Sequence, residues 1–341
     1  MESAIADWLE VVDKYYLSDF IDSGGSAFKL LLTRGEQGVP AALDEIRSLA
    51  ERQGYIYAGV SAADTRIDRI DQLFFAVARQ IDWNALVAVD AVNFLRGRDY
   101  DVPEGIEPGN TEAIAEANGC DLEDLLKDVR RATKQEITKD RRMCKEFRTA
   151  ISQLRSALFF PRNVTPSDAE TLSGWMRGEK VGAAALRDLR IYSKIGRHNA
   201  REMLIALAHW LAKSVGMGLV IGLDLRALLH PRAPEPPVGV GFDPESSSGP
   251  PQREMHYSRA ALLDAYEVLR QFIDETDEIT HCLICAAAPS EIETDEKKSI
   301  FKYYALQSRL LSEVHDVDRQ NLLSAMVHLG DVGGERIGNH G

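Results

Sequence analysis

Apolar and polar residues follow two different periodicities along this chain, and the change from one to the other predicts its main elements. Near the start, apolar residues recur every three or four positions, which predicts a helix over residues 1–20. After a glycine-rich breaker at 22–25, an apolar run predicts a strand at 27–33, then a helix at 41–53 and a strand at 55–60. Strand, helix and strand in this order predict a right-handed crossover and therefore a parallel sheet.

The middle of the chain has a different pattern. Beyond a helix at 67–80, helical spacing dominates from about residue 84 to residue 215, and no stretch there has a convincing strand pattern. Apolar strand patterns return at 217–224 and 279–288. The helical region is therefore predicted to be an insertion into a sheet-forming core.

These patterns predict an α/β fold with a parallel sheet. The predicted core is formed by residues 1–83 and 198–341, and the largely helical insertion by residues 84–197, with a winged-helix-like reader as one possible form. The second part of the core would contain a mobile Pro-rich loop at 229–252 and end in a fraying glycine-rich tail. Helices are also predicted in that part, at 257–273, 295–314 and 318–328.

Composition and charge narrow the function classes. A formal net charge of −13 argues against a whole surface built for nucleic acid, although a local basic patch is compatible with it. No apolar run approaches the length of a membrane span, and acidic residues near the N-terminus argue against a targeting peptide, so we expect a cytoplasmic protein. Cys282 and Cys285 are spaced as C-x-x-C but fall in a strand pattern, where residues three apart point to opposite faces. We predict core cysteines and no metal site.

The strand at 27–33 leads into a degenerate phosphate-binding loop. An apolar run, the glycines Gly35 and Gly38, and a following helix are the layout of a P-loop, whose full pattern is G-x-x-x-x-G-K-[ST]. Counted from Gly35, the second glycine, the lysine and the hydroxyl residue are replaced by Pro40, Ala41 and Ala42. A backbone N–H, the cation for the β- and γ-phosphates and the Mg²⁺ ligand are therefore missing. An ordinary strand–turn–helix that never bound nucleotide is the open alternative.

The second candidate signature is the apolar strand that ends at Asp224. In P-loop ATPases such a strand presents an aspartate to Mg²⁺, and a glutamate that activates water usually follows it. Here Leu225 follows, so the catalytic base is also absent. We therefore expect no catalytic residues and only a vestigial nucleotide site, in which binding of ATP with Mg²⁺ is doubtful. That site would comprise Gly35, Gly38, Pro40, Ala41, Ala42 and Asp224.

Positive charge is concentrated in one part of the predicted insertion, near residues 130–148, where acids are interleaved with the bases. A solvated helix with internal ion pairs explains this pattern, and a surface for nucleic acid or an acidic partner is the alternative. The candidate contact residues are Arg130, Arg131, Arg141, Arg142 and Arg148.

Several blocks, in order along the chain, resemble the BrxD-like ATP-binding proteins, an AAA+-type family of bacterial anti-phage systems that include BREX. The first block is Arg-Gly-Glu-Gln-Gly at 34–38, which is similar to the R-G-x-x-G opening of the family's P-loop. The other similar blocks lie at 172–178, 199–204, 218–224, 266–270 and 304–310. The resemblance implies an AAA+-like core with a nucleotide site at 35–42 and Asp224, and it suggests Arg309 as a nucleotide-sensing arginine.

Because the chain departs from that family at both nucleotide signatures, we predict a catalytically inactive AAA+-like subunit, a pseudo-ATPase. It would act as a scaffold or regulator of a homologous ATPase, a helicase or a nuclease of the same defence system, in a hetero- or homo-oligomer, possibly with DNA and without a membrane. One alternative is a divergent ATPase that takes a lysine from elsewhere, for instance Lys29 or Lys194. Another is a DNA-binding module that works through the insertion, with Arg141 and Arg142 in contact with the duplex.

Overall fold

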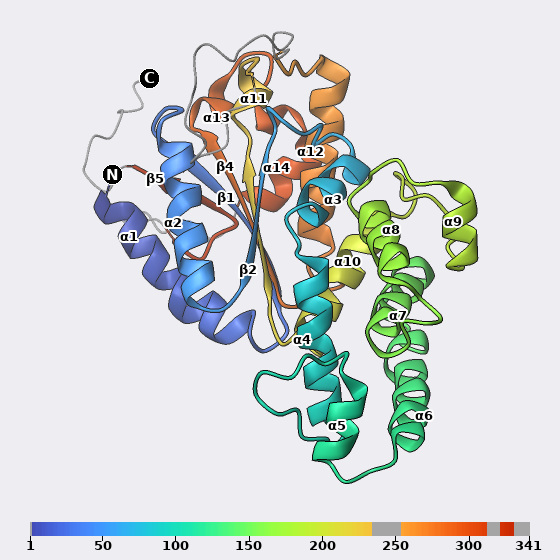
Figure 1. Ribbon diagram of the computed structural model, residues 1–341. Helices are drawn as coiled ribbons and strands as arrows, with labels where there is room; N and C mark the ends of the chain where they lie inside the picture. Colours follow the sequence, from blue (N-terminus) through green and yellow to red (C-terminus); the bar gives the residue numbers. More distant parts are fainter. Residues whose placement is uncertain (1, 234–253, 312–320, 331–341) are drawn as a thin grey trace, which may run out of the picture. The chain divides into compact units, whose positions relative to one another are not determined.

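The computed structural model of the protein describes residues 2–233, 254–311 and 321–330 and divides into two compact units (Figure 1). Unit 1 comprises Met1–Arg69 and Gly218–Gly341, and unit 2 comprises Ile70–Met217. These borders lie at 69 and 217, whereas the sequence patterns suggested 83 and 197. The predicted Pro-rich loop and glycine-rich tail fall mostly on 234–253 and 331–341, outside the described residues.

Unit 1 is built on a five-stranded sheet in which every pair of neighbouring strands is parallel. The strands lie in the order β2-β3-β4-β1-β5. Their bounds are β1 Ser26–Thr33, β2 Ile56–Ser61, β3 Leu219–Asp224, β4 Cys282–Pro289 and β5 Met326–Leu329. The prediction of an α/β fold with a parallel sheet is confirmed, and unit 2 is inserted between β2 and β3.

The last strand was missed by the sequence patterns. The helix predicted at 318–328 is wrong over the described residues from 321, where β5 pairs with β1 from Leu30↔Met326 to Thr33↔Leu329. Val327 and Leu329 are buried, whereas the side chain between them is exposed, which is the alternation of a strand with one covered face. Pairing with β1 therefore overrides the weak local helical pattern.

Helices cover both faces of the sheet (Figure 1). On one face, α1 (Glu2–Val11), η1 (Val12–Phe20) and α2 (Gly38–Arg52) bury an apolar cluster that includes Leu31 of β1. Since side chains alternate along a strand, Leu30 and Leu32 point to the other face. The helix α12 (Arg259–Asp274) packs on β1 there and contacts α14 (Tyr304–Leu310). Three short helices complete the unit: α11 (Arg226–Leu229), α13 (Glu291–Thr294) and η4 (Ile300–Lys302).

The two strand cysteines are core residues, as predicted. Cys282 and Cys285 lie in β4 and are buried, and burial raises the pKa of both thiols, that of Cys285 to about 12. Within the described part of the chain, no group of three or more histidine, cysteine or acidic side chains could hold a metal ion. A thiol that stays protonated is a poor ligand and a poor nucleophile.

Unit 2 is wholly helical. Residues 70–217 are all described and contain no strand, so the β-hairpin wing of a winged helix does not occur among them. Among the described residues as a whole, no helix combines the length and the apolar character that crossing a bilayer would need. The elements of unit 2 are α3 (Ile70–Ala78), α4 (Trp83–Arg96), α5 (Thr111–Ala117), α6 (Leu122–Thr133), η2 (Lys134–Thr138), α7 (Lys145–Phe159), α8 (Pro166–Met176), α9 (Ala183–Asp188), α10 (Ala200–Trp210) and η3 (Leu211–Val215).

Aromatic side chains and one buried ion pair hold the helices of unit 2 together. Trp83 and Trp210 stack with their ring centroids 6.1 Å apart, and Phe147 packs edge-on against both. The guanidinium of Arg155 on α7 makes two hydrogen bonds to the carboxylate of Asp90 on α4, at 2.6 and 3.0 Å. Both side chains are almost fully buried. This bidentate pair fixes the register between α4 and α7.

Candidate functional site

The candidate nucleotide site lies at the carboxyl edge of the unit 1 sheet. All five strands are parallel, so Thr33, Asp224 and Pro289 end their strands at the same edge. The helix after β1, α2, covers one face, whereas α14, in the connection from β4 to β5, is on the other. Ligands of open α/β sheets bind at such a switch point, between strands whose following helices lie on opposite faces. The fold therefore places the degenerate loop where a ligand site is expected.

The loop after β1 is short, and it becomes helical too early for a phosphate cradle. Gly35 has φ +72°, a left-handed conformation that suits glycine, and the Thr33 hydroxyl donates a 2.9 Å hydrogen bond to its carbonyl. α2 then begins at Gly38. The N–H groups of Gly38 and Val39 point back at the carbonyls of Gly35 and Glu36, at 3.4 and 3.3 Å. These amides close the first turn of the helix instead of facing an anion.

The three replaced signature residues belong to α2. Pro40 has no N–H to offer, Ala41 is exposed and Ala42 is buried in the apolar cluster beneath the helix. Gly38 is needed for packing, because a Cβ at this position would lie 2.8 Å from Cβ of Thr33. The glycine that looks like part of a cradle in the sequence is thus required by the close approach of helix and strand.

Asp224 already has a cationic partner. Its carboxylate accepts hydrogen bonds from Nε of Arg226 at 2.9 and 3.0 Å, from Nη2 at 2.6 Å and from the Arg226 backbone N–H at 3.0 Å. Both side chains are buried, with exposed fractions of 6% for Arg226 and 12% for Asp224. A Mg²⁺ ion bound through this carboxylate would have to displace a guanidinium that satisfies both oxygens.

The loop and the segment after α11 are also joined by an ion pair. Arg232 Nη1 lies 2.6 Å from Glu36 Oε2, and His230 Nε2 lies 3.9 Å from the other oxygen of the same carboxylate. A carboxylate at this place adds negative charge to a loop that would have to receive a triphosphate. The residues of this edge therefore do not fit ATP with Mg²⁺, and no catalytic step can be derived through them.

The two proposed substitute lysines have different surroundings. Lys29 is buried in the middle of β1, and its ammonium donates to the carbonyls of Leu323 and Ser324 at 2.5 and 2.9 Å. Burial lowers the pKa of Lys29 to about 8. Lys194 is an exposed residue of unit 2. The suggested sensor, Arg309 on α14, is held by the carboxylate of Asp274 on α12.

An open pocket lies at the sheet edge among the described residues. It has a volume of about 370 Å³ and lies at the ends of β1, β4 and β5, where Arg34, Ser290 and His328 supply its polar groups. Nε2 of His328 lies 2.8 Å from a carboxylate oxygen of Glu293, and this hydrogen bond raises the pKa of His328. None of the replaced signature residues lines this pocket.

The five cationic candidates of the insertion lie in different elements and have different surroundings. The segment around 130–148 is a helix end, a turn and a second helix, so the single helix inferred from the sequence is wrong. Arg131 pairs with Asp128 at 2.6 Å, and Arg148 donates to the Asp140 carbonyl at 3.0 Å. Arg141 and Arg142 are exposed in the turn.

Asp140 anchors that turn to the end of α10 and to η3. Its carboxylate lies 3.0 Å from His209 Nε2 and 2.6 Å from Lys213 Nζ. Burial by itself would raise the pKa of this carboxyl. The hydrogen bonds from Lys213, His209 and the Arg142 backbone outweigh burial and lower the pKa of Asp140 to about 2. Part of the basic segment is therefore structural.

Comparison of the chain with models of protein families, with curated proteins and with solved structures gives no match.

Proposed function

We propose that this protein is a catalytically inactive AAA+-like subunit of a bacterial anti-phage defence system, which acts as a scaffold or regulator of an active ATPase, helicase or nuclease. The assignment to defence rests on the resemblance of the sequence blocks to BrxD-like proteins. The inactivity rests on the sheet edge of unit 1. The two parts of the proposal are supported by different observations and can fail separately.

The strand order supports an AAA+-like core. Read from β5, the sheet has the order 5-1-4-3-2 with all strands parallel, and the resemblance implies a core with such a parallel sheet. The strand that leads into the degenerate loop is next to β4, and the strand that ends in Asp224 is on the far side of β4. The two candidate signatures thus lie on strands of one sheet that are separated by β4 alone.

The contact between Arg226 and Asp224 is the observation that carries the inactive function. A P-loop enzyme needs a lysine, a hydroxyl, an aspartate that can reach Mg²⁺ and a residue that orients water. Here the first two are replaced, Leu225 stands where the water-activating residue would be, and the aspartate is bound to a guanidinium. Such a site has lost every group that would stabilise the transferring phosphoryl group.

Calorimetry with ATP and Mg²⁺, together with phosphate release by the same full-length preparation, tests the inactive site. We expect no saturable binding heat and no turnover above the buffer rate. Turnover that is abolished by Asp224→Ala would overturn the proposal. Turnover that persists in Asp224→Ala would indicate a contaminating ATPase, and it would have to disappear on further purification.

A restored loop separates the contribution of the missing side chains from that of Arg226. The variant Pro40→Gly/Ala41→Lys/Ala42→Ser supplies the glycine, lysine and hydroxyl but leaves Asp224 paired. We expect it to remain without ATP binding, because the loop still starts α2 at Gly38 and Asp224 stays engaged. Binding by this variant would show that side-chain loss alone disables the site.

The scaffold role needs a partner. Co-expression of the tagged chain with an ATPase, helicase or nuclease of the same defence system should give a stable complex in size exclusion, and the partner's turnover should change on complex formation. Co-elution with no effect on turnover would support a scaffold only. Failure of all the co-expressed components to associate would overturn the role.

Exposed Arg141 and Arg142 favour DNA binding through unit 2 as a second function. A protein that neutralises phosphates loses duplex affinity steeply as salt rises. Fluorescence anisotropy with a labelled duplex should then show salt-dependent binding that is lost in Arg141→Glu/Arg142→Glu. Duplex binding that this variant retains would exclude the turn as the contact.

A further inference from the structure

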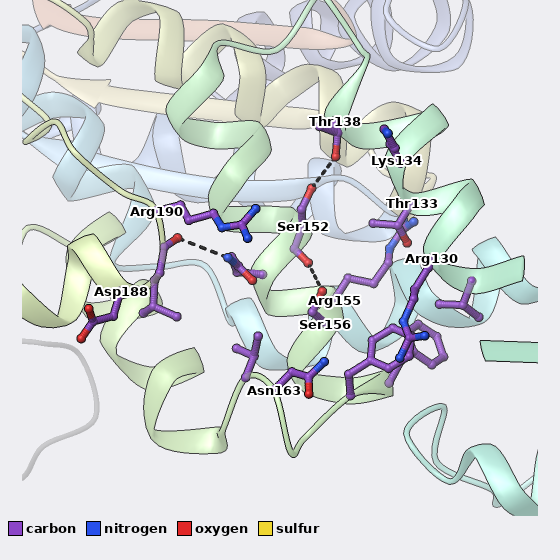
Figure 2. A pocket seen from close by; sticks show the side chains of 16 residues that line it. Arg130, Thr133, Lys134, Thr138, Ser152, Arg155, Ser156, Asn163, Asp188 and Arg190 are labelled. Atoms are coloured by element: carbon purple, nitrogen blue, oxygen red, sulfur yellow. Dashed lines mark hydrogen bonds between the residues drawn. The ribbon is translucent and has the colours of Figure 1, made fainter. Parts of the chain in front are cut away.

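A pocket of unit 2 is lined by three cationic side chains that form no ion pair with a described acid. It has a volume of about 410 Å³ and is lined by the end of α6, η2, α7, the loop after α7 and the segment after α9. Pockets of about 300–1,000 Å³ hold small-molecule ligands. Figure 2 shows Arg130 and Lys134 on one wall, Arg190 on the opposite wall, and Ser152 and Ser156 between them.

The charges of this pocket are unbalanced. Among residues 2–233, 254–311 and 321–330, no carboxylate forms an ion pair with Arg130, Lys134 or Arg190. The neighbouring Arg131 pairs with Asp128 at 2.6 Å, so acids are at hand on the same helix. Asp188 is the one acidic side chain of the lining, and its carboxylate points away from the other labelled side chains in Figure 2. In a chain of net charge −13, three such cations around one cavity indicate an anionic ligand.

Arg155 belongs to the same lining but plays a different part. Its charge is already matched by the buried carboxylate of Asp90, and its Nη1 lies 4.0 Å from Glu136. This pair holds the inner wall of the pocket rigid. The excess of positive charge therefore comes from Arg130, Lys134 and Arg190.

The pocket also offers a flat surface and neutral hydrogen-bonding groups. The guanidinium of Arg130 lies over the Phe160 ring, 4.4 Å from its centroid. A guanidinium plane supported by an aromatic ring is a platform on which nucleic-acid bases stack. On the inner wall, the hydroxyls of Ser152 and Thr138 lie 3.3 Å apart and are both partly accessible. These hydroxyls can donate to phosphate oxygens.

We propose that this pocket binds a free nucleotide of the nucleoside monophosphate class. Lys134 and Arg190 hold the phosphate together with the hydroxyls of Ser152 and Thr138. The base of the nucleotide stacks on the guanidinium of Arg130, which is supported by the Phe160 ring. The site is separate from the sheet edge of unit 1, so its existence does not depend on the pseudo-ATPase proposal.

Titration calorimetry with AMP, ribose 5-phosphate and adenosine tests both halves of the site. We expect AMP to bind most tightly, ribose 5-phosphate more weakly and adenosine least. Lys134→Gln/Arg190→Asn should weaken AMP binding at least about tenfold, because it removes two charge-assisted contacts. Asparagine is chosen at 190 because it tolerates the left-handed φ of +63° there.

The matched control is Lys180→Gln/Arg197→Asn, which removes the same two residue types from exposed positions that do not line the pocket. It should leave AMP affinity within about twofold of wild type. Phe160→Leu should weaken AMP binding while leaving ribose 5-phosphate binding unchanged. Circular dichroism checks that each variant keeps its helical content.

Three results would overturn the proposal. The first is absence of saturable binding at millimolar AMP. The second is AMP binding that survives Lys134→Gln/Arg190→Asn unchanged, or that the control variant weakens equally, since the nucleotide would then bind elsewhere. The third is a single-stranded oligonucleotide that binds more tightly than AMP and is weakened equally by both variants, which would indicate an extended basic surface.

Discussion

The sheet edge of unit 1 and the basic pocket of unit 2 differ in how far their charged side chains are paired within the protein. At the sheet edge, Asp224 is matched by Arg226 and Glu36 by Arg232, and in the middle of β1 the ammonium of Lys29 is held by two carbonyl groups. In the pocket, Arg130, Lys134 and Arg190 form no ion pair with a described acid, and the carboxylate of Asp188 in the lining points away from them (Figure 2). In the region with a recognisable nucleotide motif, the charged side chains are thus paired within the protein. In the region without a motif, cationic side chains remain available to pair with a ligand.

This difference indicates where to look for a ligand in a protein with degenerate signatures. A site that has lost its ligand is free to acquire internal contacts that stabilise the fold, since nothing selects against them. A site in use keeps charges that destabilise the ligand-free protein, because stability and function are often in conflict. Charge imbalance is therefore a better guide to a working site than motif similarity.

The largest effect is expected at Arg226. Arg226→Met leaves Asp224 buried without a cation and should lower the free energy of unfolding by about 3–5 kcal/mol. Arg232→Met is the control, because its pair with Glu36 is about one-third exposed (32% and 37%) and should cost about 1 kcal/mol or less. Urea unfolding measures both. Equal losses in the two variants would mean that the Asp224 pair is not the internally satisfied site described above.

Lys29 should give the next largest effect. Lys29→Met leaves the carbonyls of Leu323 and Ser324 without their donor and should cost about 2–3 kcal/mol. The pKa of Lys29, about 8 in the fold, lies below its value of about 10.4 in the unfolded chain. The unfolded state then binds more protons between these values, so wild-type stability should rise from pH 8 to pH 10.

The variant Lys29→Met should lack that rise, and the exposed Lys14→Met should keep it. Urea midpoints between pH 7 and pH 10 provide the measurement. A rise that persists in Lys29→Met would assign it to another group. Loss of ATP turnover in Lys29→Met would instead support the divergent ATPase.

Asp140 should contribute about 2–3 kcal/mol to the free energy of unfolding, and this contribution should be lost in acid. Its folded pKa of about 2 lies below the unfolded value of about 3.9, and each pKa unit corresponds to about 1.4 kcal/mol. The stabilisation is therefore present above pH 4 and is lost as the pH falls from about 4 to about 2. Asp140→Asn should be less stable than wild type at pH 6 and nearly equal to it at pH 2, in thermal or urea unfolding. A constant difference across this range would contradict the assignment.

The smallest predicted effect has the opposite sign. Arg130 and Lys134 are like charges four residues apart, so Lys134→Gln should stabilise the protein by about 0.2–0.5 kcal/mol, and high salt should abolish the gain. Lys139→Gln, outside the pocket, should be neutral. Precise thermal midpoints at low and high salt compare the two. Destabilisation by Lys134→Gln would mean that this lysine is satisfied within the fold, and the contrast between the units would disappear.

The sequence predicted the strands that are buried through their own composition. β3 and β4 are almost wholly apolar and β1 is mostly apolar, with Lys29 in its middle, and the parallel crossover follows from the helix between β1 and β2. β5 was not predicted from the sequence, because it has four residues and owes its conformation to pairing with β1, which is far away in the sequence. Such a strand has no local signal, since the energy that fixes it comes from tertiary contacts.

The features of the candidate sites also divide into those that the sequence shows and those that depend on tertiary contacts. Replacement of Pro40, Ala41 and Ala42 is visible in the sequence, and the loss of a phosphate cradle was predicted from it. The early start of α2 at Gly38 and the contact of Arg226 with Asp224 were not, because they depend on burial and backbone direction. Arg190 was not recognised as a binding residue, because it is far in sequence from Arg130 and no periodicity relates the two.

The interior position of β1 in the sheet bears on how the chain is synthesised. Among the described residues β1 pairs with β4 and β5, which both follow unit 2 in the sequence, whereas the residues of unit 2 are contiguous. Contacts between distant segments form slowly, because a long loop must close before they contribute. Unit 2 can therefore fold during translation, while β1, which leaves the ribosome early, waits for its neighbours with its edges exposed. In that interval the nascent chain depends on chaperones or on the speed of translation, and premature termination before β4 would leave a folded helical unit attached to an aggregation-prone strand.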